Sequence, residues 1–215
     1  MIKRVIHTAI TLAVLLVSCR QDDLPDSMPT AHEGYVALRF SADIPAMQEV
    51  VTRSVDPDGG GVQDMTLFCF DSYGLFTTTV EAKVTPTGNG AGLTGNFEAE
   101  VPENTRTVHF LANQNMSEFK EDKFRNKSEA EVMALLEGSS GRMIYWARFT
   151  CDPDNDSKID AQMADKGNTI KMIRNHAQVS IDNPINGWIE VTGFVAYNTN
   201  AFGTVAPSHP GKGFD

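Results

Sequence analysis

The chain has 215 residues, with 18 lysines and arginines against 28 aspartates and glutamates, so its formal net charge is −10 at pH 7. Such a negative field repels phosphate backbones, and no cluster of basic residues interleaved with aromatics offsets it, so the composition argues against nucleic acid as a partner. The length suits one large domain, or one domain and part of another.

Residues 1–18 predict a bacterial lipoprotein signal peptide. Two basic residues precede an apolar run that is too short to span a membrane, and the run ends in Leu16-Val17-Ser18-Cys19. A cysteine at the cut is the residue whose thiol receives diacylglycerol, and palmitate is then typically added to the new amino terminus. We therefore expect cleavage between Ser18 and Cys19 and lipidation of Cys19. A plain secretory leader with an incidental cysteine is the alternative.

Residues 19–34 predict an acidic tether, because they hold four acidic residues and two prolines and little that could be buried. Acidic residues directly after a lipidated cysteine, here in Arg20-Gln21-Asp22-Asp23, resemble the export signal that sends lipoproteins to the cell surface in some anaerobic Gram-negative bacteria. We expect a surface-exposed lipoprotein of the cell outer membrane.

From Tyr35 onward the pattern predicts mostly β-strands. Residues 35–42 alternate as in a half-buried strand, whereas 64–71 are apolar on both faces and should lie centrally in a sheet. Cys69 should be a buried free thiol there, and the sequence leaves open whether it pairs with Cys151. Further strands are expected at 75–84, 96–101, 105–112, 142–150, 169–181 and 188–198.

One short helix is predicted between the strands. Ser128 and Glu131 form a capping box, and apolar residues follow at helical spacing until Gly138. We expect this helix to lie against a sheet. Strands at this spacing with one helix between them indicate a mainly-β sandwich.

Three segments, 65–74, 107–113 and 172–179, follow one another behind the lipoprotein signal. In this order they resemble the fimbrillin family, the subunits of type V pili and related surface lipoproteins of anaerobic Gram-negative bacteria. The resemblance implies transthyretin-like, Greek-key β-sandwich domains and a fimbrium subunit, in a shaft, anchor or tip position, that assembles by donor-strand exchange and serves cell adhesion. Its expected partners are other fimbrial subunits and a host protein or glycan.

The resemblance also implies a maturation cut. In that family a trypsin-like protease cuts after an arginine beyond the first strand, which frees the lipid-bearing segment and opens a groove for a strand of the next subunit. Arg53, followed by Ser54 near a glycine-rich stretch, stands at the matching place. An ordinary exposed loop arginine is the alternative.

The first sandwich should span residues 35–167, and 168–215 should begin a second, incomplete β domain. A single strand after 169–181 is too little to close another sandwich. Either the chain continues beyond Asp215, which is our expectation, or the strands after Thr169 complete the first sandwich. No donor strand is recognisable at the carboxy terminus, which favours an anchor, a tip or a non-polymerising relative over a polymerising shaft subunit.

An acidic run contains the strongest candidate for a ligand site. Positions one, three, five and nine of a calcium-type loop are occupied by Asp152, Asp154, Asp156 and Asp160. Ser157 stands where the turn needs glycine, and Met163 stands where a bidentate glutamate should close the coordination sphere. A solvated acidic loop is the alternative, and we expect no cofactor.

No catalytic motif is recognisable, so we expect that the protein is not an enzyme. The histidines are scattered along the chain, at His7, His32, His109, His176 and His209. Aromatic residues at strand spacing either line a sugar-binding surface or pack in the core, and here they are Tyr145, Trp146 and Trp188. A monomeric outer-membrane lipoprotein that binds glycans or host proteins through its loops is the alternative to a fimbrial subunit.

Overall fold

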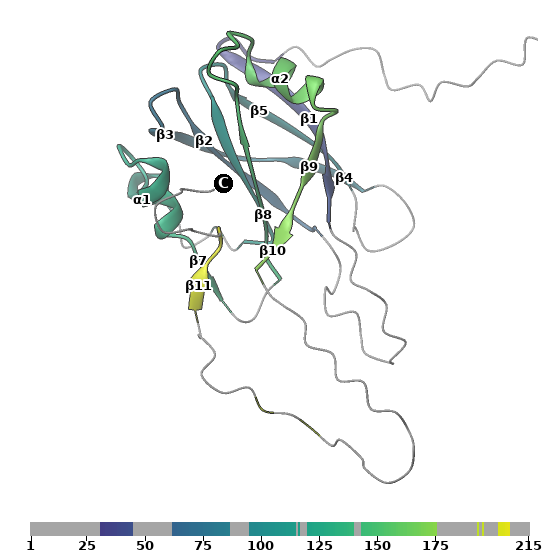
Figure 1. Cartoon of the computed structure of the whole chain (residues 1–215), viewed down its shortest axis with the longest axis vertical. Coiled ribbons are helices and arrows are strands. Elements are labelled where there is room, and N and C mark those ends of the chain that lie inside the picture. The colour runs from purple at the N-terminus through teal and green to yellow at the C-terminus, as the bar shows by residue number, and fades with distance from the viewer. Residues whose placement is uncertain are drawn as a thin grey trace, which may run out of the picture.

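The chain was analysed as a computed structural model, which describes residues 31–44, 62–86, 95–114, 116, 120–139, 143–175, 193, 195 and 202–206. Within these residues, two β-sheets pack face to face, and helices lie on the outside (Figure 1). The four-stranded sheet has the order β4-β5-β1-β9, and the five-stranded sheet has the order β10-β8-β6-β2-β3. The prediction of a mainly-β sandwich with a short helix is therefore confirmed.

The elements are bounded as follows. The strands are β1 (Tyr35–Asp43), β2 (Met65–Phe70), β3 (Phe76–Glu81), β4 (Lys83–Pro86), β5 (Gly95–Pro102), β6 (Thr107–Ala112), β7 (Glu137–Ser139), β8 (Tyr145–Thr150), β9 (Thr169–Lys171), β10 (Ile173–Arg174) and β11 (Phe202–Thr204). The helices are the short 3-10 helix η2 (Glu121–Lys123), α1 (Glu129–Ala134) and α2 (Ile159–Asp165). Strands β7 and β11 pair with each other, apart from the two large sheets.

The four-stranded sheet is built around β1. This strand runs antiparallel to β5, with seven paired residues from Tyr35 to Ser41, and its last three residues run parallel to β9. Every second side chain of β1 is buried, as the period-two pattern predicts. The buried side chains are Val36, Leu38, Phe40 and Ala42, and they enter the layer between the two sheets, which we call the inner core.

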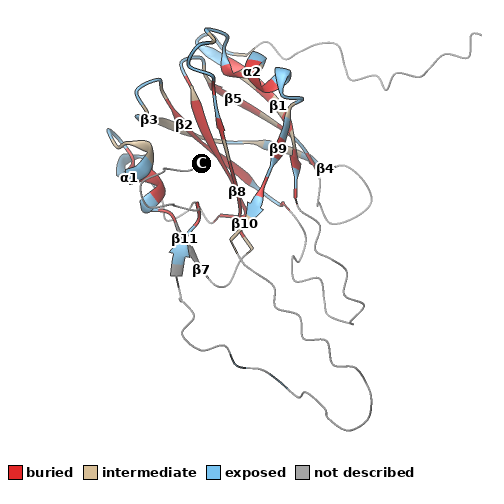
Figure 2. Cartoon of the chain, viewed as in Figure 1, coloured by how far each residue is buried: buried red, intermediate tan, exposed pale blue. Residues whose placement is uncertain are grey.

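The five-stranded sheet buries apolar side chains on both faces, because each face has its own cover. Leu67 and Cys69 of β2 enter the inner core, whereas Phe68 and Phe70 face outward into a second cluster beneath α1, which we call the outer core. Figure 2 shows buried residues, in red, along the strands of both sheets. The prediction for β2 is confirmed, and Cys69 is a buried free thiol whose pKa is raised by burial to about 12.

The predicted helix is α1. The Ser128 side chain accepts from the Glu131 backbone N–H at 3.4 Å, and the Glu131 carboxylate accepts from the Ser128 backbone N–H at 2.8 Å. Val132 and Met133 then face the outer core. Among the described residues, neither α-helix has the length and apolar run that a membrane-spanning helix needs.

The structure differs from the predictions in two places. The single strand expected at 75–84 is divided, because β3 pairs in the five-stranded sheet and β4 in the four-stranded sheet, so the chain changes sheets at Ala82. In addition, α2 lies between the strands expected at 142–150 and 169–181, where the sequence predicts no helix. Its buried residues, Ile159, Gln162 and Met163, have helical spacing, but seven residues are too few for that spacing to stand out.

Residues 169–174 add a short strand to each sheet, since β9 pairs with β1 and β10 pairs with β8. The sequence predicts that a second domain begins at residue 168, and in the structure residues 169–174 pair with strands of the first sandwich. Residues 176–192 and 207–215 lie outside the described residues, as does most of the strand expected at 188–198. The second domain therefore stays a prediction.

Candidate functional site

The residues predicted for maturation, Ser18, Cys19, Arg53 and Ser54, lie outside the described residues. The last described residue before Arg53 is Ile44, directly after β1, and the next described residue is Val62, shortly before β2. In sequence, Arg53 therefore stands in the connection between these two strands. Its cleavage stays a prediction.

The tether predicted at 19–34 contacts the sandwich at its end. His32 lies against Glu100 of β5, and the backbone N–H of Tyr35 donates to the His32 carbonyl. The hydrogen bond to the Glu100 carboxylate raises the pKa of His32, and the same contact lowers the pKa of Glu100. The residues just before β1 are therefore attached to the neighbouring strand.

The calcium-type loop is organised by a glutamine. The Gln162 side chain accepts from the backbone N–H of Asp152 at 2.7 Å and donates to the carbonyls of Asn155 at 3.0 Å and Ser157 at 2.9 Å. Its side chain thus fixes the loop from within, through the backbone of three loop residues. Among the described residues no group of three or more acidic, histidine or cysteine side chains could hold a metal ion.

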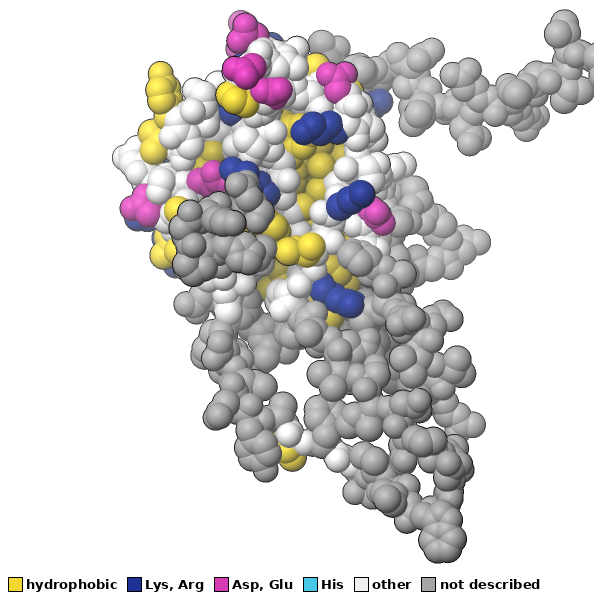
Figure 3. Space-filling view, in the orientation of Figure 1, with side chains coloured by type: hydrophobic (Ala, Val, Ile, Leu, Met, Phe, Trp, Pro, Cys, Tyr) yellow, Lys and Arg dark blue, Asp and Glu magenta, His cyan; other side chains and the backbone are white. Residues whose placement is uncertain are grey.

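The structure therefore does not bring Asp152, Asp154, Asp156 and Asp160 together as calcium ligands. Asp152 instead accepts from the backbone N–H of Asp154 at 3.0 Å, as in a loop that stabilises its own turn. Figure 3 shows acidic side chains at the end of the molecule where α2 lies, which fits a solvated acidic surface.

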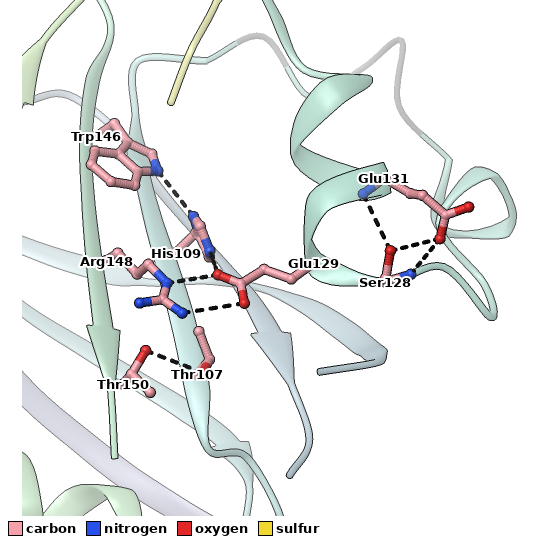
Figure 4. A network of polar contacts seen from close by, with 8 residues as sticks. All are labelled: Thr107, His109, Ser128, Glu129, Glu131, Trp146, Arg148 and Thr150. Carbon is pink, nitrogen blue, oxygen red and sulfur yellow. Dashed lines mark hydrogen bonds and ion pairs between the residues drawn. The ribbon is translucent and has the colours of Figure 1, made fainter. Parts of the chain in front are cut away.

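A polar network centred on the buried His109 links α1 to the outer face of the five-stranded sheet (Figure 4). Glu129, the first residue of α1, accepts from His109 Nε2 at 2.6 Å and from Arg148 Nε at 2.6 Å. On the other side of the ring, Trp146 Nε1 donates to His109 Nδ1 at 3.0 Å. The register places His109 of β6 directly opposite Arg148 of β8, so the pairing of these strands brings both side chains beneath the helix.

The contacts define the charge states in this network. Because Nδ1 accepts a hydrogen bond from the Trp146 indole N–H, Nδ1 carries no hydrogen, and the His109 imidazole is neutral with its hydrogen on Nε2. Burial lowers the pKa of His109, which agrees with the neutral ring. Burial alone would raise the pKa of Glu129, but hydrogen bonds from His109 and Arg148 outweigh it and hold the pKa at about 2.

The geometry of this network favours a structural role, in which it attaches α1 to the five-stranded sheet. His109 is fully buried and both of its ring nitrogens are engaged, so in this arrangement it offers no free lone pair to a substrate. The charges of Glu129 and Arg148 neutralise each other across the helix–sheet interface. The network therefore fixes α1 over the outer core.

Sequence reasoning missed this network. The sequence places His109 in the strand expected at 105–112 but indicates no contact for it, and it assigns Glu129 no role beside the capping box. The available signal was a histidine and an arginine, each on a strand with apolar neighbours, together with an acidic residue at a helix start. Only the strand register shows that these residues meet.

The aromatic residues considered for sugar binding behave as core residues where they are described. Tyr145 is completely buried in the inner core, and Trp146 is buried in the outer core. Trp188 lies outside the described residues.

No family model matches the sequence, and no curated protein matches it. Among solved structures, the chain is similar to a fimbrial assembly protein from Parabacteroides distasonis, with 13% sequence identity and a TM-score of 0.30. The alignment covers 65% of this chain and 54% of that protein, so the chain spans about half the length of the structure that it matches. At this level the likeness assigns neither a family nor a function, and membership in the fimbrillin family stays a prediction.

Proposed function

We propose that this protein is a lipid-anchored fimbrial subunit in which β1 is an exchangeable strand. The observation that supports the proposal is the position of β1 in the chain and in the fold. It is the first strand after the lipoprotein signal, yet it lies between β5 and β9 inside a sheet. A cut after Arg53 would leave β1 attached to the lipid and held to the rest of the sandwich only by noncovalent contacts.

Loss of β1 would leave a slot with strong affinity for another strand. Seven residues of β1 pair with β5, so its departure would expose a row of backbone donors and acceptors. It would also uncover the sites of Val36, Leu38 and Phe40, whose burial stabilises the sandwich by roughly 1.5–3 kcal/mol each. A strand from a neighbouring subunit would restore both contributions.

The slot left by β1 constrains the direction and the side-chain pattern of a donor strand. It must run antiparallel to β5 and place apolar side chains at alternate positions. At the site of Phe40 it meets two aromatic rings, since Phe97 stacks there at 5.4 Å and Phe110 lies edge-on at 4.9 Å. An aromatic donor residue at that position is therefore favoured.

The lipid at Cys19 would hold the uncut form on the outer membrane, and the cut would release the subunit for assembly. The proposed role is structural and adhesive rather than catalytic.

An arginine-specific protease tests the proposal. We expect brief treatment of the full-length chain to give one early cut after Arg53, followed by higher-order species in size analysis. Arg53→Ala should remain uncut at this position and should not assemble. Early cleavage without any change in size would contradict strand exchange, and early cleavage only at other arginines would contradict the maturation site.

A further inference from the structure

The outer edge of β3 is the second place where a foreign strand could join the sandwich. Within the described residues, β3 is the last strand of the five-stranded sheet: it pairs with β2 on one side, and on the other side its first residue, Phe76, donates its backbone N–H to the Lys127 carbonyl at 2.9 Å. An unprotected edge strand offers its free backbone groups to any other strand. Residues 76–81 contain phenylalanine, three threonines and valine but no proline or lysine, a composition that favours such pairing.

A glutamate from outside the sheet covers this edge. Glu121 Oε1 accepts from the backbone N–H of Thr79 at 3.1 Å and lies 3.2 Å from the Thr79 hydroxyl. The Thr78 hydroxyl donates to the same oxygen at 2.8 Å. Because backbone groups of an antiparallel edge strand point alternately toward and away from the partner strand, the Thr79 N–H that bonds to Glu121 is an outward-facing group.

The covering carboxylate is held in place by packing. Glu121 begins η2, and Phe124 directly after η2 is buried in the outer core. The Phe124 ring lies edge-on to Phe68 at 5.5 Å and beside Phe76 at 5.4 Å. The hydrogen bonds from Thr79 and Thr78 also lower the pKa of Glu121, so its negative charge persists at the edge.

We propose that Glu121 closes the outer edge of β3 against a second copy of this chain. Without this carboxylate, two copies would pair antiparallel through β3, with Thr79 at the centre of the contact. A second copy is the favoured occupant because an antiparallel pair of identical edges is self-complementary and closes as a two-fold dimer. Glu121 thus prevents two copies from pairing through the five-stranded sheet, whether or not β1 is exchanged.

Sedimentation velocity tests the proposal. The full-length wild-type chain and three variants are compared in the same detergent buffer. We expect Glu121→Ala to form dimers at concentrations where the wild-type chain is monomeric. Glu121→Gln keeps an oxygen that accepts from Thr79, so it should remain monomeric. Asp122→Ala removes the same charge from the same turn but leaves the Thr79 contact, and it should also remain monomeric.

Amide hydrogen exchange supplies a second measurement that does not depend on dimer formation. At low concentration, Glu121→Ala should exchange the Thr79 amide about tenfold faster than the wild-type chain, since that amide loses its acceptor. Wild-type mass together with wild-type exchange in this variant would overturn the proposal. So would a dimer that survives in Glu121→Ala/Thr79→Pro, because the added proline removes the central N–H of the edge.

None of these outcomes requires cleavage at Arg53. A failure of strand exchange and a failure of edge closure are therefore distinguishable.

Discussion

Phe40→Ala is expected to destabilise the sandwich by about 3–5 kcal/mol, the usual cost of removing a buried phenyl ring. The Phe40 side chain is 3% exposed and fills the inner core between the two sheets. Its contacts with Phe97 and Phe110 cross from β1 to a neighbouring strand and to the opposite sheet, so no single local shift can close the cavity. Urea unfolding of the wild type and the variant measures the effect: the midpoint should fall while the dependence of the unfolding free energy on urea concentration stays the same.

Tyr35→Ala is the matched control for Phe40→Ala. Tyr35 is an aromatic residue of the same strand but is 44% exposed, so its loss should cost less than about 1 kcal/mol. Equal losses in the two variants would contradict the placement of β1 with its even-numbered residues in the core.

Glu129→Ala is expected to destabilise the chain by about 3 kcal/mol, because it removes the acceptor that the buried His109 and the half-buried Arg148 share. Arg148 would keep its charge at the helix–sheet interface without a counter-ion, and His109 would lose the acceptor of its Nε2 hydrogen. Glu103→Ala is the control, since the ion pair of Glu103 with Lys158 is exposed and should contribute less than about 1 kcal/mol. Similar losses in both variants would contradict a structural role for the network.

The pH dependence of Glu129→Ala gives a further check on the same variant. The carboxyl has an ordinary pKa of 4.5 and a pKa of about 2 in the folded chain, so the unfolded state binds its proton first as the pH falls. Its contribution is therefore fully present above about pH 5 and is lost progressively toward pH 2. We expect the difference in free energy of unfolding between wild type and variant to shrink over this range. A difference that does not change with pH would contradict the charged network.

Much of the fold was predictable because strand periodicity reflects burial directly. The alternation in β1 and the two apolar faces of β2 follow from a sheet with one core between the layers and another beneath α1. The capping box at Ser128 was predictable because it is a local contact within four residues. These features depend on residues close together in the sequence, so they can be predicted from the sequence alone.

The rest depends on contacts between distant residues. The change of sheet at Ala82 was not predictable, because β3 and β4 share the same period and differ only in their partners. The acidic residues after Cys151 match part of a calcium loop by spacing, yet in the fold the Gln162 side chain bonds to the backbone of that loop. The link from His109 to Glu129 requires the position of α1 over the sheet, which the sequence does not specify.

The strands β1 and β3 have different roles in the proposed assembly. β1 lies inside the sheet and has a deep apolar slot, so a replacement strand gains both backbone pairing and core packing. The β3 edge offers only backbone pairing, and Glu121 covers the central N–H of that edge. Strand exchange at β1 without association at β3 would give a defined direction of assembly.

Capture of a labelled peptide tests the exchange of β1 most directly. The full-length chain is cut after Arg53 and mixed with an excess of a peptide that spans residues 35–43. We expect one peptide to be captured per cut chain and none by uncut chain, and we expect the peptide with Phe40→Ala to bind at least about 100-fold more weakly. Failure of the cut chain to capture the peptide, or equal capture of both peptides, would contradict an exchangeable first strand.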